Sequence, residues 1–114
     1  MEKLLAAIRL VESAGDDRAV GDRGRSLGPF QISRAYWLDG GGDPRRYDSD
    51  VWSAESSGAV VLGYWRRYAA AALSAGDCEK LARIHNGGPT GARKTATIAY
   101  WSKVKTAMAQ KGEI

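Results

Sequence analysis

The chain has 114 residues, of which 44% are hydrophobic and 26% are charged, and these values are typical of one globular domain and exclude a disordered chain. The 17 lysines and arginines outnumber the 13 aspartates and glutamates, which gives a net charge of +4. This charge suits an anionic partner, but it does not choose between nucleic acid, a membrane surface and an anionic cell wall.

The chain has one cysteine and one histidine, which limits its chemistry. Cys78 alone cannot form an internal disulfide, and His85 alone excludes a metal site with two histidines. We therefore predict no metal ion and no cofactor. No run reaches the roughly 18 apolar residues of a membrane span. The charged, amphipathic start also lacks the uninterrupted apolar stretch of a secretory signal.

The first part of the chain predicts two helices separated by an irregular segment. Apolar residues recur every three or four positions over residues 2–13, which predicts a helix. Residues 15–32 are rich in glycine and predict an irregular segment or a small β-hairpin. Ser33 is typical of the N-cap of a short helix over residues 34–39, and residues 40–44 predict a flexible turn.

The second part of the chain predicts three more helices. The longest is expected from residue 49 or 50 to about residue 74, and its Gly58 and Gly63 predict close packing against another backbone. Two further helices are expected over residues 78–86 and 95–110. Four residues of the last helix are expected to face inward: Ile98, Trp101, Val104 and Met108. The fold class is therefore mainly α, as a single helical domain with a small insert at about residues 15–32.

Glu12 is the first candidate for chemistry. It follows Ile8 by one turn on the apolar side of its helix, where partial shielding from water favours the protonated carboxyl. A carboxylic acid still protonated near neutral pH is what a general acid needs. The alternative is an exposed glutamate at a helix end, since structural carboxylates outnumber catalytic ones.

Asp22 is the second candidate, although alone it is better interpreted as a turn residue that bonds its own backbone. Asp16 and Asp17 compete for the role, but they follow the helix too closely to turn back across a cleft. As a pair, Glu12 and Asp22 can face each other across a groove, and unlike environments can make one an acid and the other an anion. That arrangement serves glycoside hydrolysis, where a leaving oxygen is protonated and an oxocarbenium ion is stabilised.

Five sequence blocks then give a specific resemblance. They are Glu12-Ser13, Ser-Leu-Gly-Pro-Phe-Gln-Ile at 26–32, Tyr-Trp-Leu-Asp at 36–39, His-Asn-Gly-Gly-Pro-Thr-Gly at 85–91 and Tyr-Trp-Ser-Lys-Val at 100–104. In this order they resemble the invertebrate-type, destabilase-like lysozymes, from about residue 8 to residue 105. The resemblance implies a lysozyme-like catalytic domain over residues 1–114. It also implies a bacteriolytic muramidase that cleaves peptidoglycan between N-acetylmuramic acid and N-acetylglucosamine, with Glu12 as the acid and Asp22 as the second carboxylate.

The chain departs from this family in two respects. The family is rich in disulfides, whereas Leu27, Gly40 and Ala92 stand where its members usually place cysteine, so the chain looks like a bacterial or phage relative. Some members are also credited with isopeptidase activity through a serine and a lysine seven residues later. Here Ser26 is present but Ser33 takes the place of the lysine. A serine without a nearby base is a poor nucleophile, so we do not expect that activity.

Six residues are expected to bind the substrate: Ser26, Gln31, Tyr36, His85, Asn86 and Gly87. Aromatic faces stack on sugar rings, and we expect Tyr36 to face the cleft while Trp37 is buried. A lone histidine is usually structural, but beside Asn86 and two glycines His85 is expected to line the far side of the groove. Glycine backbone lets a polymer approach closely, and the Asn86 amide can bond an N-acetyl group.

Three other functions compete with this reading. A lytic transglycosylase would use Glu12 alone, so Asp22 discriminates against it, and a non-catalytic cell-wall-binding protein would keep the groove without needing Glu12. A helical nucleic-acid-binding protein would need a continuous basic helix face, which the sequence lacks. We expect a monomer that binds peptidoglycan strands and no nucleic acid. It should act on the cell wall outside the cytoplasm. We assign no route, export or release, by which it would reach the wall.

Overall fold

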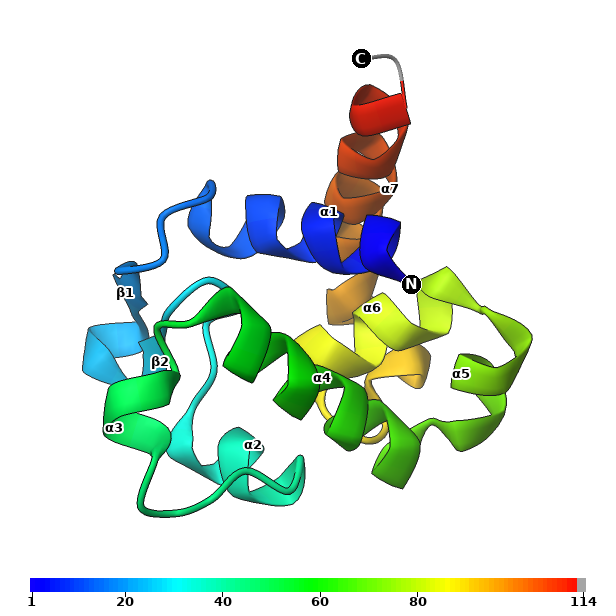
Figure 1. Cartoon of the computed structure of the whole chain (residues 1–114). Coiled ribbons are helices and arrows are strands. Elements are labelled where there is room, and N and C mark those ends of the chain that lie inside the picture. Colours follow the sequence, from blue (N-terminus) through cyan, green and yellow to red (C-terminus); the bar gives the residue numbers. More distant parts are fainter. Residues whose placement is uncertain (113–114) are drawn as a thin grey trace.

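Helices make up most of the chain in the computed structural model, which describes residues 1–112 (Figure 1). The α-helices are α1 (Glu2–Ser13), α2 (Arg34–Asp39), α3 (Tyr47–Asp50), α4 (Ala54–Tyr68), α5 (Ala70–Ala75), α6 (Cys78–Gly87) and α7 (Ile98–Gly112). Short 3₁₀ turns are η1 (Asp22–Gly24), η2 (Gly91–Arg93) and η3 (Thr95–Thr97), and the strands are β1 (Val20–Gly21) and β2 (Ser26–Leu27). The predicted mainly α fold with a small hairpin is confirmed.

The hairpin occupies the glycine-rich segment between α1 and α2. Strand β1 pairs antiparallel with β2, so that Val20 lies opposite Leu27 and Gly21 lies opposite Ser26. The turn between them is tight because Asp22, Arg23 and Gly24 have φ values of +50°, +59° and +89°. Non-glycine residues rarely adopt positive φ, so the pairing on both sides holds this turn in shape.

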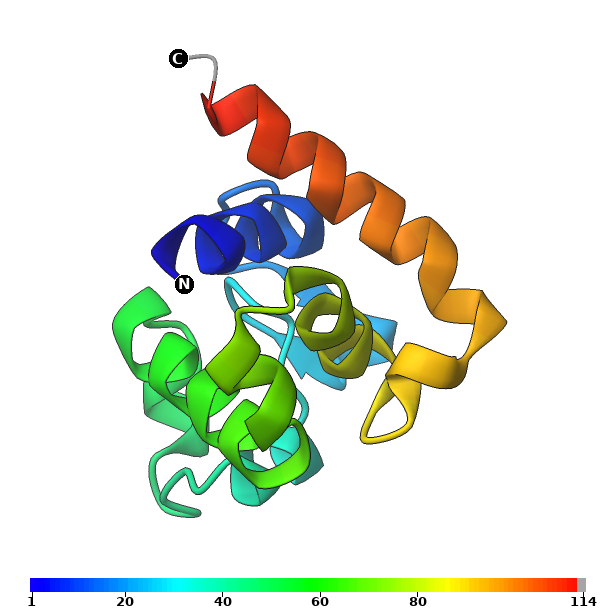
Figure 2. The same cartoon turned by 90° about the vertical axis from the view of Figure 1, so that its right-hand side faces the viewer.

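The core lies where α1, α4, α6 and α7 meet. Leu4 and Ile8 of α1, Trp65 of α4, Leu81 of α6 and Val104 of α7 are each exposed by 1% or less. Helix α7 packs against both α1 and α6, and its C-terminal part extends beyond the rest of the chain in both views (Figures 1 and 2). Burial of these apolar faces is the main source of stability, because the single cysteine cannot form an internal disulfide.

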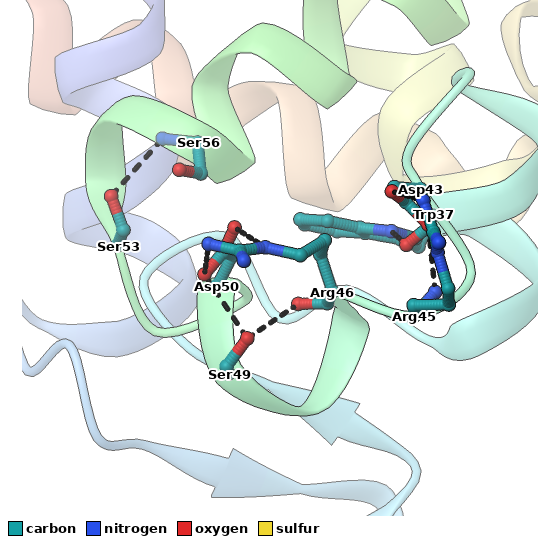
Figure 3. A network of polar contacts seen from close by, with 8 residues as sticks. All are labelled: Trp37, Asp43, Arg45, Arg46, Ser49, Asp50, Ser53 and Ser56. Atoms are coloured by element: carbon teal, nitrogen blue, oxygen red, sulfur yellow. Dashed lines mark hydrogen bonds and ion pairs between the residues drawn. The ribbon is translucent and has the colours of Figure 1, made fainter.

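The single long helix predicted between residues 49 and 74 is wrong, since three helices fill this stretch. The Ser53 side chain accepts a hydrogen bond from the Ser56 backbone N–H at 3.1 Å and starts α4 (Figure 3). Ala69, with φ −145° and ψ 38°, interrupts the chain between α4 and α5. The apolar period continues across both breaks, and therefore periodicity alone did not reveal them.

Polar contacts hold the connection from α2 to α3 (Figure 3). The Trp37 indole N–H donates to the Asp43 carbonyl at 2.8 Å, and the side chains of Arg45 and Asp43 form an ion pair at 3.2 Å. Arg46 Nε lies 3.0 Å from Asp50 Oδ2 at the start of α3. These contacts fix α2, which contributes residues to the groove described below.

The predictions for the last helix are partly wrong. Helix α7 begins at Ile98 instead of Thr95, because buried Thr97 caps the preceding turn by donating its hydroxyl to the Gly91 carbonyl at 2.7 Å. Ile98 is 52% exposed, so the expectation that it faces inward is wrong. Val104 is fully buried, and Trp101 and Met108 are partly buried against the core as predicted.

Close backbone packing is found at one of the two helical glycines. A Cβ placed on Gly63 would lie 2.1 Å from the carbonyl oxygen of Gly40, so α2 and α4 can approach only because Gly63 has no side chain. A Cβ on Gly58 would meet nothing nearer than the Phe30 ring at 3.8 Å, an ordinary contact. The prediction is thus confirmed for Gly63 and wrong for Gly58.

Candidate active site

A groove of about 550 Å³ gathers side chains from α1, the hairpin, α2, α4 and α6. Seven of the eight residues predicted for the site line it: Glu12, Asp22, Ser26, Gln31, Tyr36, His85 and Asn86. Gly88 takes the place of Gly87. The groove therefore brings together residues that are far apart in the sequence.

Glu12 lies in the last turn of α1 and is mostly shielded from solvent. Its side chain is 18% exposed, and its Oε2 accepts a hydrogen bond from the Tyr100 hydroxyl of α7 at 3.0 Å. Burial, and secondarily the nearby Glu12 carboxyl, raises the pKa of Tyr100 well above its ordinary value, so this hydroxyl remains a donor. The contact between α1 and α7 thus fixes one oxygen of Glu12.

His85 also contacts Glu12, and both of its ring nitrogens have partners within the protein. Nε2 lies 3.2 Å from Glu12 Oε2 and 3.2 Å from the Phe30 carbonyl oxygen, while Nδ1 lies 2.7 Å from the Tyr36 hydroxyl. A carbonyl oxygen can only accept, so Nε2 carries a hydrogen. In the neutral ring Nδ1 then accepts from Tyr36, whose pKa is raised mainly by burial, with a smaller effect of Tyr64, so that its hydroxyl stays protonated.

This geometry changes the expected role of His85. Its side chain is 3% exposed, and its polar atoms are directed at Glu12, Phe30 and Tyr36. The predicted direct binding of substrate does not fit that burial. Its Nε2 hydrogen-bonds to the Phe30 carbonyl and lies 3.2 Å from the Glu12 oxygen that Tyr100 contacts, so the ring places a polar N–H group beside that oxygen.

Asp22 enters the groove from the hairpin turn and is more exposed than Glu12. Its Oδ2 accepts a hydrogen bond from the Ser26 hydroxyl at 2.6 Å, so the predicted binding residue Ser26 fixes this carboxylate. The competing residues do not line the groove: Asp17 forms an ion pair with Arg9 at 2.6 Å, and Asp16 accepts from the backbone N–H of Arg18.

Gln31 and Gly87 serve mainly to shape the chain around the groove. The Gln31 amide donates to the Ala19 and Gly28 carbonyls, both at 3.0 Å, and ties the hairpin to the next loop. A Cβ at Gly21 would lie 2.3 Å from Gln31 Oε1, so a larger residue there would displace the Gln31 amide. The Gly87 carbonyl accepts from the Lys94 ammonium at 2.6 Å, which gives Gly87 a structural contact away from the groove lining.

The aromatic wall of the groove is a stacked tyrosine pair. The rings of Tyr36 and Tyr64 are 3.9 Å apart between centroids and 6° from parallel. Trp37 is 3% exposed, so Tyr36 lines the groove and Trp37 is buried, as predicted. The sequence analysis missed Tyr64 and Asp39 as lining residues. Tyr64 follows the apolar period of α4, and nothing in the sequence marks its face as a groove wall.

Among residues 1–112, no group of three or more histidine, cysteine, aspartate or glutamate side chains could hold a metal ion. Within the same residues, no helix has the length and apolar character needed to cross a membrane.

Comparison with known proteins places this groove in a family context. The family described as Destabilase matches residues 1–107. A lysozyme from Meretrix lusoria is 41% identical over 80 residues, which cover 70% of this chain and 66% of that protein. Lysozyme 1 from Crassostrea virginica is 40% identical over 80 residues, which cover 70% of this chain and 44% of that protein. The chain thus spans about two thirds of one relative and less than half of the other.

Solved structures give the same relationship over more of the chain. The inhibitor-bound lysozyme from Meretrix lusoria matches with a TM-score of 0.78 and 35% identity, over 93% of this chain and 88% of that one. The Tapes japonica lysozyme matches with a TM-score of 0.78 and 34% identity, over 91% of this chain and 87% of that one. The fold described above is the fold of these lysozymes, and the chain belongs to the destabilase family.

Proposed function

We propose that this chain is a peptidoglycan hydrolase, a muramidase that cleaves between N-acetylmuramic acid and N-acetylglucosamine with two carboxylates. The observation that carries the proposal is that Glu12 and Asp22 line one groove in unlike surroundings, the first largely buried and the second exposed. Two carboxyl groups held in different environments are suited to separate acid and anion roles. The match to lysozymes of the same fold supports this reaction.

Glu12 is assigned the role of general acid. The Tyr100 hydroxyl donates to Oε2, and His85 Nε2 lies 3.2 Å from the same oxygen. Among the described residues no donor contacts Oε1, which leaves that oxygen to carry the acidic proton. Protonation of the glycosidic oxygen from Oε1 would leave a negative charge on Glu12, and the Tyr100 donor at Oε2 and the nearby N–H of His85 would stabilise it.

Asp22 is assigned the role of the second carboxylate. It is exposed, and its Oδ2 is held by Ser26 at 2.6 Å. A carboxylate at this position can stabilise the positive charge that develops on the sugar ring. The Ser26 hydroxyl fixes its direction, which matters because electrostatic stabilisation depends on preorganised groups.

The substrate is expected to lie along the groove with the tyrosine pair as an apolar wall. Asn86 is exposed beside His85 and lines the groove, where its amide can bond an N-acetyl group. The protein would act as a monomer on the cell wall, outside the cytoplasm.

Mass spectrometry of products from purified peptidoglycan tests the proposal. Wild-type protein should release muropeptides with reducing ends, whereas anhydro-muropeptides would indicate a lytic transglycosylase and no products a wall-binding protein. General acid catalysis contributes about 10²–10⁴-fold, so Glu12→Gln should lose at least that factor in kcat while staying folded. Asp22→Asn should also lose most activity while substrate still binds.

Asp16→Asn is the matched control, since it makes the same change in the same segment outside the groove lining. It should keep wild-type activity. A folded Glu12→Gln protein with a tenth or more of the wild-type rate would overturn the role of Glu12. If Asp22→Asn is nearly as active as wild type, a mechanism that uses Glu12 alone is favoured.

A further inference from the structure

We propose that Arg23 and Arg25 form a subsite for the carboxylate groups that the glycan strand carries, and that this subsite selects muramic-acid-containing polymers over uncharged ones. The inference rests on the proposed function, because it names which polymer the groove prefers. It concerns two arginines that have no part in the chemistry assigned to Glu12 and Asp22.

A second cavity of about 480 Å³ extends the groove at the hairpin. Arg23 and Arg25 line it together with Asp22, Ser26 and Ser33. The last three residues also line the main groove, so the two hollows adjoin each other at these residues. A polymer bound past Asp22 would therefore run directly along both arginines.

The two guanidinium groups have no partner of their own in the part of the chain that the structure describes. Six other arginines each lie within 3.6 Å of a carboxylate oxygen. Arg23 and Arg25 are exposed and form no such pair among residues 1–112, although Asp22 is next to Arg23 in the sequence. The Asp22 carboxylate accepts from Ser26 instead, which leaves both arginines available to an external anion.

The charges of the main groove give a reason for a basic subsite beside it. Glu12, Asp22 and Asp39 line that groove and would repel an anionic polymer. Arginines at the adjoining cavity would offset this repulsion and would contact carboxylates in a bidentate manner. The turn that carries Arg23 is held by the β1–β2 pairing on both sides, so the site needs little ordering when ligand binds.

The ligand class follows from the chemistry of the polymer. A glycan strand with peptides carries the carboxylates of those peptides, and a peptide-free strand carries the lactyl carboxylate of muramic acid. Oligomers of N-acetylglucosamine carry neither group. The subsite therefore predicts a preference that the groove around Glu12 and Asp22 does not supply.

Three substrates and one charge-matched control test the subsite. The substrates are intact peptidoglycan, the same glycan after amidase removal of its peptides, and a chitin oligomer of N-acetylglucosamine. In Arg23→Gln/Arg25→Gln, kcat/KM on the carboxylate-bearing substrates should fall about 2- to 30-fold, the range for two exposed ion pairs. The change on the chitin oligomer should stay within twofold. Raising the salt concentration should reduce the difference in kcat/KM between wild type and variant on the carboxylate-bearing substrates.

The control variant is Arg66→Gln/Arg93→Gln, which removes the same charge from two exposed arginines that do not line either cavity. If kcat/KM of the Arg23→Gln/Arg25→Gln variant falls on intact peptidoglycan alone, the subsite binds the peptide carboxylates. If it falls on both anionic substrates, the subsite also binds the lactyl carboxylate. Unchanged kcat/KM on both, an equal loss on the chitin oligomer, or an equal loss in the control would overturn the proposal.

Binding separates a failure of the subsite from a failure of the proposed function. If wild-type protein cleaves none of the three substrates, the muramidase proposal fails. Sedimentation with insoluble peptidoglycan then still tests the subsite, because the Arg23→Gln/Arg25→Gln variant should bind peptidoglycan more weakly than the Arg66→Gln/Arg93→Gln control. Equal binding of the two variants would overturn the subsite as well.

Discussion

His85→Gln is the substitution that best tests whether His85 positions Glu12 or binds the substrate. Glutamine keeps much of the buried volume, but its flexible amide cannot reproduce the two opposed contacts of the imidazole. Those contacts are 2.7 Å from Nδ1 to the Tyr36 hydroxyl and 3.2 Å from Nε2 to Glu12 Oε2. We expect kcat to fall while KM changes little, because the ring does not face the substrate.

The size of the effect follows from the lost contacts. His85 Nε2 donates to the Phe30 carbonyl and lies 3.2 Å from Glu12 Oε2, so the contact with Glu12 is a polar one and not a full hydrogen bond. Such a contact contributes about 1 kcal/mol, and its loss in the transition state corresponds to a decrease in kcat of about fivefold. The buried Tyr36 hydroxyl would also lose its partner, which costs about 1–3 kcal/mol of unfolding free energy. Both quantities should therefore decrease, and urea unfolding measures the second one independently.

Steady-state kinetics on soluble glycan strands provide the assay, with Asn86→Ala as the neighbouring control. Asn86 is exposed and lines the groove one residue after His85, so its truncation should raise KM and leave kcat within a few-fold of wild type. A second variant, Tyr36→Phe, removes only the hydroxyl that Nδ1 contacts and should lower kcat less than His85→Gln does. If folded His85→Gln protein keeps kcat within threefold of wild type, His85 is merely structural and the reasoning about Glu12 is refuted.

Two further predictions concern stability. Gly63→Ala should lower the unfolding free energy by about 1–3 kcal/mol, because its Cβ would clash with the Gly40 carbonyl. Gly58→Ala in the same helix should be neutral or stabilising by up to about 1 kcal/mol. Equal effects of the two substitutions in urea unfolding would contradict the close packing at Gly63. Burial, with the Glu12 carboxyl nearby, raises the pKa of Tyr100, so unfolding becomes more favourable above the ordinary tyrosine pKa of about 10. Tyr100→Phe should therefore reduce the loss of stability between pH 10 and 11 by about 1 kcal/mol, and an unchanged slope would argue against that burial.

Local signals in the sequence were sufficient where the neighbouring residues alone decide the structure. Ser33 caps α2 by accepting from the Tyr36 N–H at 3.1 Å, and Asp77 caps α6 by accepting from the Lys80 N–H at 3.1 Å. Both helices begin where these caps predicted. The hairpin was also foreseen, since a glycine-rich segment allows the tight turn that it requires.

The breaks on either side of α4 were not predicted because they leave the apolar spacing unchanged, although the Ser53 cap at the start of α4 is a local signal. The buried Ser57 hydroxyl donates to the Val51 carbonyl at 2.6 Å, which satisfies a backbone group that a continuous helix would have paired itself. Trp65 donates to the Leu81 carbonyl at 2.9 Å and fixes α4 against α6. Neither contact leaves a periodic pattern, so a helix that ends and restarts has the same apolar spacing as a long one.

In the candidate site, too, some features could be predicted from the sequence and others arise only from the packing of the helices. Glu12 and Asp22 could be identified from the sequence by their residue type and position, and both line the groove. Tyr100 was noted only as part of a sequence block, and its contact with Glu12 joins residues 88 positions apart. His85 was identified but given a different role, because its burial and its Tyr36 partner arise only when α2 and α6 pack together.

The two carboxylates are held by different kinds of contact, one through the helical core and one within the hairpin. This explains how the chain can place both without disulfides. Glu12 depends on Tyr100 and His85, whose own positions depend on the packing of α1 against α6 and α7. Its orientation is therefore coupled to the stability of the core. Asp22 depends on Ser26 across a short exposed hairpin, so its orientation is a local property. Substitutions around Glu12 should shift activity and stability together, whereas substitutions at the hairpin can change activity and substrate preference while the core stays intact.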